Sequence, residues 1–341
     1  MSDQFTYEEI TGNPKPRIAF EESDKKDLSG LRILVTGAGG SIGSRVALLL
    51  ANVPNISIFA LDRDENALHS LSLSMSQTAL FDNANYILQD IRDAEGLDNL
   101  FDEKKFDLVV HCAALKHLSA LEIYPREAYL TNVVGTYNLL QSATKFQVPR
   151  FLNVSTDKAV RPSSVLGKSK RIAELLTIGY RNNGYPGFTN VRFGNVFNSK
   201  GSVIETFSHQ MQRNFPVTLT DANMRRFFMH TDEAALLAIK SVIINKGQIH
   251  MLDMGLSIPI VNVINNLKIA LNSSSPITIT GARKGEKIDE DLMNDFEDAI
   301  TTQHEKIRVL SSDERGFLSI PAVNPISHIL AAQIMEGLLG D

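Results

Sequence analysis

One stretch of the sequence, residues 32–50, limits the possible fold more than any other. It reads Arg-Ile-Leu-Val-Thr-Gly-Ala-Gly-Gly-Ser-Ile-Gly-Ser-Arg-Val-Ala-Leu-Leu-Leu. An apolar segment of strand length is followed directly by a glycine-rich turn and an apolar segment of helix length. In such a unit Gly37 permits the tight turn, Gly40 lets the backbone approach a pyrophosphate, and Gly43 allows the helix to pack on the strand. The stretch therefore predicts a dinucleotide-binding site at the N-terminus of that helix.

Further segments with the composition of short buried strands follow along the chain: residues 56–61, 86–89, 107–112 and 151–155. Longer amphipathic segments separate them. Alternating strands and helices of these lengths predict an α/β fold, in which a doubly wound parallel sheet of Rossmann type is covered by helices on both faces. Ligands of such a sheet bind beyond the carboxyl ends of the strands.

The chain is expected to divide into three regions. Residues 1–30 are polar without periodicity and predict an N-terminal arm, with order starting near Leu31. Residues 31–190 form the predicted dinucleotide-binding domain, which has a return strand near 191–196. In residues 197–341 glycine, proline and asparagine interrupt shorter elements, which predicts mainly a smaller substrate-binding lobe.

Composition excludes several classes of function. The 34 lysines and arginines stand against 39 acidic residues, a net charge of -5, so no general affinity for nucleic acid or anionic lipid is expected. The single cysteine, Cys112, rules out an internal disulfide, and the eight histidines suggest no metal site. No apolar run approaches the about 20 residues of a membrane helix. Residues 1–26 are too polar for a secretion signal, so a soluble, cytoplasmic protein is expected.

The residues around the predicted dinucleotide bear on its identity. Ser41 and Ile42 open the first helix and are expected beside the phosphates. Asp62 ends the second predicted strand, where a carboxylate hydrogen-bonds the adenosine ribose and repels a ribose phosphate, which favours NAD. Arg63 follows directly and could instead pair with a 2'-phosphate, so NADP remains open. Two residues after the third strand are expected to border the adenine: Asp90 and Ile91. For Asp90 alone, a solvated loop acid is an equally good interpretation.

Six further motifs occur in order along the chain: His111–His117, Thr131–Thr136, Ser155–Ala159, Val191–Val196, Gly201–Ile204 and Arg283–Lys287. Together with Thr36–Gly43, they resemble the extended short-chain dehydrogenase/reductases. Within that superfamily they are similar to the CapD-type branch, the nucleotide-sugar 4,6-dehydratases of bacterial polysaccharide and glycan biosynthesis, over roughly residues 10–310. Many members carry an N-terminal membrane region, and this chain resembles their soluble catalytic part.

The resemblance implies a hydro-lyase with a tightly held, recycled NAD. Such an enzyme oxidises the sugar at C4, eliminates water across C5 and C6, and returns the hydride to C6. The substrate implied is a UDP-sugar, with UDP-N-acetylglucosamine as the first choice. Neither the base nor the sugar follows from the sequence, nor does the question whether C5 is inverted.

A tyrosine is missing from the implied site. In the wider superfamily a tyrosine and a lysine four residues apart share one helix face, and here Lys170 takes the lysine position while Leu166 takes that of the tyrosine. Leucine cannot move a proton. Either the chain has lost its chemistry or other residues carry it; the CapD-type branch often has an apolar methionine at this place.

The acid and the base are then expected in Asp157 and Lys158, which follow the fifth strand. By resemblance, Lys158 removes the C5 proton and Asp157 protonates the departing C6 hydroxyl, while Asp157 or a water takes the C4 hydroxyl proton. A free lysine titrates at ~10.4, and a base at neutral pH needs a lower pKa than that. An ion pair with Asp157 would shift the pKa values of both groups in the wrong direction, so these roles require the two side chains to face the substrate rather than each other. The alternative is a structural ion pair. Ser155 and Thr156 are candidate donors to the C4 oxygen, although Thr156 could equally cap the strand end.

The resemblance implies further contacts on both ligands. On the cofactor side these are Ala113, Ala114, Lys116, Asn132 and Lys170. On the substrate side they are Lys116, Asn195, Gly201, Ser202, Val203, Arg226 and Arg283. Dispersed donors of this kind suit a nucleotide diphosphate, and Arg283 is the preferred phosphate ligand. Simple helix packing is an equally good interpretation of Asn132.

Two predicted helices, near Pro125–Thr144 and Ser164–Tyr180, carry apolar faces. By resemblance these faces pair between two copies in a four-helix contact, so a homo-oligomer is expected. Three functions compete. A 4,6-dehydratase fits best, a nucleotide-sugar 4-epimerase is disfavoured by Leu166, and a non-catalytic dinucleotide-binding protein would not need Asp157 and Lys158.

Overall fold

The computed structural model describes residues 5–76, 85–321 and 326–340. Its centre is a nine-stranded sheet in the order β14-β15-β11-β6-β5-β4-β1-β2-β3. The parallel strands are β1 (Arg32–Thr36), β2 (Ser57–Asp62), β3 (Tyr86–Leu88), β4 (Leu108–His111), β5 (Arg150–Val154), β6 (Phe188–Arg192) and β11 (Ile249–Leu252). Two antiparallel strands, β15 (Ile307–Ser311) and β14 (Asp298–Thr301), complete one edge. The predicted Rossmann-type α/β fold is confirmed.

The order of the strands determines where a ligand can bind. From β1 the chain moves outward through β2 and β3, and then returns to place β4 on the other side of β1. This reversal leaves a crevice at the carboxyl ends of β1 and β4. The five strands predicted from the sequence correspond to β1–β5, with ends that differ by at most one residue. Three consecutive residues of β1, Ile33, Leu34 and Val35, are apolar and fully buried, which explains why the sequence pattern predicted this strand.

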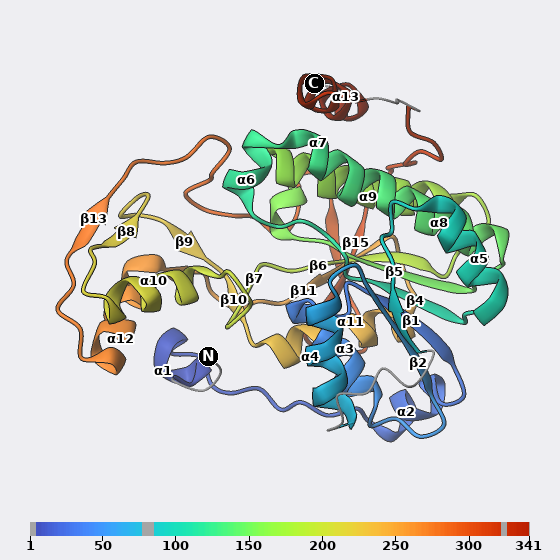
Figure 1. Ribbon diagram of the computed structural model, residues 1–341, viewed down its shortest axis with the longest axis horizontal. Coiled ribbons are helices and arrows are strands. Elements are labelled where there is room, and N and C mark those ends of the chain that lie inside the picture. The colour runs from blue at the N-terminus through green and yellow to red at the C-terminus, as the bar shows by residue number, and fades with distance from the viewer. Residues whose placement is uncertain (1–4, 77–84, 322–325, 341) are drawn as a thin grey trace.

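Helices cover both faces of the sheet (Figure 1). One face carries α5 (Ala94–Lys104), α6 (Leu118–Ile123), α7 (Pro125–Ala128), the π-helical turn η1 (Tyr129–Val134), α8 (Gly135–Lys145) and α9 (Val165–Asn182). The other carries α2 (Glu22–Leu28), α3 (Ser41–Leu50), α4 (Glu65–Ser76) and α11 (Thr231–Ile244). Each layer has its own apolar core against the sheet, and the two cores bury the strand residues on opposite faces.

A smaller lobe lies beside the sheet and has a third apolar core (Figure 1). Its helices are α1 (Tyr7–Thr11), α10 (Val203–Gln212) and α12 (Ile260–Leu271). Short strand pairs complete it or join it to the sheet domain: β7 (Asn195–Val196) with β10 (Phe228–Met229), β8 (Val217–Leu219) with β13 (Ile277–Ile279), and β9 (Arg225–Arg226) with β12 (Ile258–Pro259).

Two regions differ from the sequence-based division. Instead of an irregular arm, residues 5–30 contain α1, which packs on α12 and buries Ile10, and α2, which packs on α11 and buries Leu28. Helices of five and seven residues are too short to show a periodic pattern. Residues 197–341 also supply β11, β15 and β14 to the main sheet, so that region contributes to both parts of the molecule.

The C-terminal helix α13 (His328–Leu339) lies across α7, η1 and α9 (Figure 1). Ala331 and Met335 are fully buried in the core of that layer. Arg126 Nε donates to the carbonyl of Ile326 over 2.9 Å, which fixes the start of the helix. Helix α13 of the same chain thus covers part of the helical face on which the contact with a second copy was expected.

A buried charge network attaches residues 292–297 to the sheet domain. Arg192 of β6 has no solvent exposure; it donates to Glu174 of α9 over 2.9 and 3.1 Å and to Glu297 over 2.9 Å. Its guanidinium also donates to the carbonyl of Leu292 over 3.0 Å. Burial alone would raise the pKa of Glu174, but Arg192 and Arg171 outweigh it and lower that pKa to about 2. The network therefore holds residues 292–297 against the sheet.

Replacing Arg192 with methionine should lower the free energy of unfolding by about 3–5 kcal/mol, because Glu174 and Glu297 would be buried without this partner. Denaturant unfolding followed by circular dichroism measures the loss. The matched control is Arg45→Met, whose side chain is 42% exposed and pairs with Asp232 on α11; it should lose at most about 1 kcal/mol. Equal losses in the two variants would contradict this assignment.

Candidate active site

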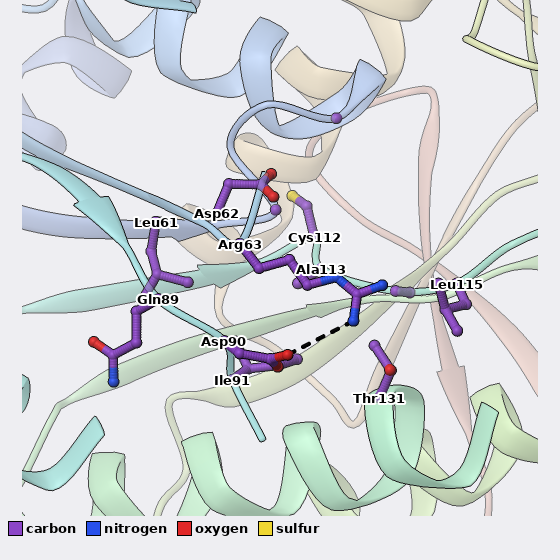
Figure 2. Close-up of a pocket in the computed structure, with 13 residues that line it drawn as sticks. Leu61, Asp62, Arg63, Gln89, Asp90, Ile91, Cys112, Ala113, Leu115 and Thr131 are labelled. Atoms are coloured by element: carbon purple, nitrogen blue, oxygen red, sulfur yellow. Dashed lines mark ion pairs between the residues drawn. The ribbon is translucent and has the colours of Figure 1, made fainter. Parts of the chain in front are cut away.

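A cavity opens at the crevice between β1 and β4 (Figure 2). It is lined by Gly37, Gly40, Leu61, Asp62, Arg63, Gln89, Asp90, Ile91, Cys112, Ala113, Ala114, Leu115 and Thr131. Most of the predicted cofactor residues therefore come together in one place. They belong to the ends of β1, β2, β3 and β4 and to η1, which are distant along the chain.

The glycine turn fits a closely approaching ligand. Gly37 has a φ of +65°, and a Cβ there would lie 2.6 Å from the Ala113 backbone. A Cβ at Gly43 would lie 2.2 Å from the Gly37 carbonyl oxygen, so the helix can approach the turn only with glycine at this position. Gly40 precedes the first turn of α3, which begins with Ser41 and Ile42. The backbone N–H groups of this first turn suit the pyrophosphate of a dinucleotide.

The acidic residues at the cavity have defined partners. Asp62 accepts from the Gly39 amide over 2.9 Å, which places its carboxylate beside the glycine turn. Arg63 extends across the cavity toward Asp90, with 3.6 Å between Nη1 and Oδ2 (Figure 2). Arg92 also pairs with Asp90, over 2.7 Å. Asp90 is thus ion-paired, and the interpretation as a solvated loop acid is wrong; burial would raise its pKa, but Arg92 lowers it overall.

Asn132 ties three elements together beside the cavity. Its Oδ1 accepts from the Leu115 amide over 2.8 Å, and its Nδ2 donates to the Leu115 carbonyl and to Ser169 Oγ, each over 3.0 Å. The side chain has no solvent exposure. These contacts fix the loop after β4 relative to η1 and α9.

Helix α9 carries both Lys170 and Leu166, and the surroundings of the two side chains differ. Burial lowers the pKa of Lys170 to about 8, and Glu174 and Cys112 oppose that shift. Leu166 is buried in a small apolar cluster with Leu121 and Ala128. Two tyrosines of the neighbouring helices are engaged elsewhere: Tyr129 donates to the Pro321 carbonyl and Tyr124 contacts the His328 ring. Those contacts hold both side chains on the α13 side of the helical layer.

Asp157 and Lys158 lie in a short 3-10 helix, η2 (Asp157–Ala159), directly beyond β5. Lys158 Nζ donates to Asp157 Oδ1 over 2.9 Å and to Asn195 Oδ1 over 3.3 Å, and Thr156 Oγ1 also donates to Asp157 Oδ1, over 2.8 Å. The lysine and aspartate therefore face each other, whereas the predicted acid and base roles require them to face a substrate. Among the described residues, two buried atoms here have no hydrogen-bond partner: Asp157 Oδ2 and Ser155 Oγ.

Sequence reasoning missed a second carboxylate at this pair. Glu290 is buried, and its Oε1 lies 3.7 Å from Lys158 Nζ. Burial raises the pKa of Glu290, and Lys158 opposes that shift. The residue stands three positions after the Arg283–Lys287 motif, in a run of charged residues that resembles an ordinary solvated loop.

The guanidinium of Arg226 bonds backbone carbonyls, whereas the sequence analysis expected it to contact the substrate. It is buried, and its guanidinium donates to the carbonyls of Arg225, Lys287 and Ile288 over 2.6–2.7 Å. These bonds hold the segment that carries Glu290. Arg283 is exposed and donates to Ser119 Oγ of α6 over 2.9 Å, so it bridges the segment and the sheet domain.

Three more of the predicted substrate residues follow β7: Gly201, Ser202 and Val203. Gly201 has a φ of +67°, and a Cβ there would lie 2.5 Å from the His117 ring. Ser202 caps α10 by accepting from the Glu205 amide, and Val203 opens that helix. Lys116 is exposed on the loop after β4.

Lys200, which the sequence reasoning did not single out, joins this segment to the glycine turn. Its Nζ donates to the Gly39 carbonyl over 3.1 Å, and its amide donates to Ser41 Oγ over 3.0 Å. The lobe thus approaches the predicted phosphate position from the side opposite the sheet.

Fold and site together define an extended short-chain dehydrogenase/reductase: a Rossmann-type sheet, a glycine turn, a buried lysine on α9 and a second lobe over the crevice. Within that class, the chain belongs to the family described as "Polysaccharide biosynthesis protein", which matches residues 33–312.

Among characterised proteins, the chain is 37% identical to "Capsular polysaccharide biosynthesis protein CapD" of Staphylococcus aureus, over 83% of this chain and 48% of that protein. It is 32% identical to a "UDP-glucose 4-epimerase" of Rickettsia bellii, over 78% of each. The predicted CapD-type resemblance is confirmed. The chain spans about half the length of the first curated relatives that it matches, 48% and 46%.

Two solved structures have the same fold. Pen from Bacillus thuringiensis has a TM-score of 0.75 and 27% identity, over 92% of this chain and 98% of that one. DesIV, a dTDP-glucose 4,6-dehydratase from Streptomyces venezuelae solved with NAD and TYD bound, has a TM-score of 0.67 and 24% identity, over 77% and 88%.

In the parts of the chain that the structure describes, no helix combines the length and apolar character needed to cross a membrane. The same residues contain no cluster of three or more histidine, cysteine, aspartate or glutamate side chains arranged to hold a metal ion.

The affinity for NAD should depend on the charge of Lys170. Because its pKa is lowered to about 8, the ammonium is lost above that pH, and a lysine that bonds the cofactor ribose binds it best when charged. The affinity should therefore fall above pH 8, by up to about tenfold per pH unit. Calorimetric titration across pH 7–9.5 measures it. Lys170→Met should bind more weakly and without this slope; the same slope in both proteins would contradict the assignment.

Proposed function

We propose that this chain holds NAD and catalyses the 4,6-dehydration of a UDP-N-acetylhexosamine, with UDP-N-acetylglucosamine as the first candidate. The observation that carries the proposal is the Asp157–Lys158 pair, buried beyond β5 at the ligand-binding edge of the sheet. An acid and a base at that edge suit elimination of water. A helix face that carries Leu166 offers no phenol for the chemistry of the C4 hydroxyl.

NAD, when bound, supplies the acceptor and later the donor of the hydride. The residues of the chain account for the proton transfers. Asp157, as a carboxylate, receives the proton of the C4 hydroxyl, and Ser155 and Thr156 donate to the C4 oxygen. Lys158, as an amine, removes the proton from C5, and the electron pair of the C5–H bond passes into the enolate. Asp157 then returns its proton to the C6 oxygen, which leaves as water, and Lys158 reprotonates C5 when hydride returns to C6.

These roles require the Lys158–Asp157 ion pair to open when the substrate enters. Two buried atoms beside it, Asp157 Oδ2 and Ser155 Oγ, have no partner within the described chain, so a sugar with several hydroxyls would satisfy them. Asn195 already contacts Lys158 and is placed to bond the sugar as the pair opens. The diphosphate would take Arg283 and Lys116, while Gly201–Val203 would face the uridine or the sugar.

A nucleotide-sugar 4-epimerase is the second candidate, because one relative of 32% identity carries that name. Epimerisation also begins with oxidation at C4 but loses no water, so the mass of the product separates the two functions. A protein that binds a dinucleotide without catalysis is the third candidate.

We also propose a cytoplasmic homo-oligomer that uses a face other than the one α13 covers. Exposed apolar side chains near the start of α13 support this: Ile123 is 66% exposed and Ile329 is 74% exposed, beside the Tyr124–His328 ring contact. Sedimentation at micromolar concentration tests it, and a purely monomeric protein would rule it out.

The dehydratase proposal is tested by mass spectrometry after incubation with UDP-N-acetylglucosamine in deuterated water. The wild-type product should have lost one water and gained one solvent deuterium at C5. Asp157→Asn and Lys158→Ala should each lower the rate by about 10²–10⁴-fold, because each removes one proton-transfer group. An unchanged mass with a changed sugar configuration would indicate an epimerase. An unchanged sugar would rule out this substrate.

The proposed preference for NAD over NADP depends on Asp62. Heat release of the cofactor from purified protein, followed by chromatography, should yield NAD(H). Asp62→Asn should raise the affinity for NADP relative to NAD, because the carboxylate that repels a 2'-phosphate is removed. NADP released from the wild type would overturn the preference and favour Arg63 as the phosphate partner.

A further inference from the structure

The Lys158 ammonium lies between two carboxylates that come from different parts of the chain. Asp157 Oδ1, in η2, is 2.9 Å away, and Glu290 Oε1, in the segment that follows the Arg283–Lys287 motif, is 3.7 Å away. The Glu290 side chain is only 3% exposed. Its Oε2 is buried and has no hydrogen-bond partner among the described residues.

The other cations near Glu290 direct their donors elsewhere. Arg226 Nη2 is 3.9 Å from Glu290 but donates to the Lys287 carbonyl over 2.7 Å. Lys287 Nζ is 4.0 Å from Glu290 but donates to the Val160 carbonyl over 2.7 Å. These two cations, Lys158 and Asp157 are the charged groups that face Glu290. None of the three cations hydrogen-bonds Glu290, although each lies within 4.0 Å of it, so its buried Oε2 keeps the capacity to accept a proton.

A proton transfer from Lys158 to Glu290 would neutralise both side chains without changing the total charge of the site. Burial raises the pKa of Glu290 and so favours its carboxylic acid form. The same transfer would release Asp157 from its ammonium partner. A single step would therefore prepare both residues for the roles proposed above.

We propose that Glu290 is the positioning residue that accepts the ammonium proton of Lys158 and so converts Lys158 into the amine that attacks the C5 hydrogen. An N–H bond of Lys158 breaks and an O–H bond forms on Glu290. The C5–H bond then breaks, its proton joins the Lys158 nitrogen, and its electron pair forms the enolate. A side-chain rotation or one bridging water closes the 3.7 Å gap. This inference rests on the proposed dehydratase function for its catalytic consequence, but not for the proton transfer itself.

The kinetic test uses Glu290→Gln, which keeps the shape of the side chain but cannot take the proton. At pH 7, kcat should fall by about 100-fold with KM little changed. The deficit should shrink by up to tenfold per pH unit toward alkaline pH, because Lys158 must then lose its proton to solvent. Glu290→Asp should recover part of the rate. A uniform loss at every pH would indicate a merely structural role and overturn the proposal.

The matched control is Asp291→Asn, the adjacent carboxylate, which is 46% exposed and pairs with Arg161. It should keep both the rate and the pH profile of the wild type. Thermal unfolding and NAD binding of Glu290→Gln should also match the wild type. If Glu290→Gln does not fold, Glu290→Asp replaces it in the measurement of Lys158 labelling.

A second measurement does not depend on activity. Trace acetic anhydride labels amines and not ammonium groups, and peptide mass spectrometry quantifies the label on Lys158 across pH 6–10. We expect more labelling at pH 7 in the wild type than in Glu290→Gln, since Glu290 holds the proton in part of the wild-type molecules. Equal or reversed labelling would identify Glu290 as a simple counter-ion and overturn the inference. A wild type that labels as expected but removes no water from the sugar would refute only the proposed function.

Discussion

The placement of the late segment that carries Glu290 into the candidate site depends on one fully buried side chain, Arg192. It belongs to a central strand, yet its guanidinium reaches Glu174 on the covering helix α9 and Glu297 on a segment about 100 residues later. A buried arginine is tolerated only when its charge and its donors are satisfied, and here two carboxylates and a carbonyl satisfy them. Because Glu297 cannot leave without exposing that charge, the segment that ends there is held against the sheet.

That segment brings the later part of the chain to the chemistry of the earlier part. It carries Glu290 to Lys158 and Arg283 to α6, while Arg226 in the lobe holds its backbone. On the other side of the crevice, Lys200 reaches the glycine turn. The later part of the chain is therefore attached to the sheet domain both at the glycine turn and at the Asp157–Lys158 pair.

Sequence patterns predicted the features that depend on local physics. The glycine turn, β1–β5 and the position of Asp62 each follow from a few adjacent residues whose burial or backbone geometry permits few alternatives. Features that depend on distant contacts were missed. Helices α1 and α2 owe their stability to packing on α12 and α11, and α13 covers a helical face that looked available for a partner. Glu290 has the composition of a solvated loop and becomes a buried carboxylate only through Arg192 and Arg226.

The missing tyrosine is accounted for by packing and charge together. Leu166 contributes to an apolar cluster between α6 and α9, so that helix face is adapted to exclude water rather than to move a proton. The ionisable groups have instead gathered beyond β5, where Asp157, Glu290, Lys158, Arg226 and Lys287 carry one net positive charge. The second carboxylate gives the lysine a partner other than Asp157. A site of this composition can separate an acid from a base without a phenol, which is the requirement that elimination of water imposes.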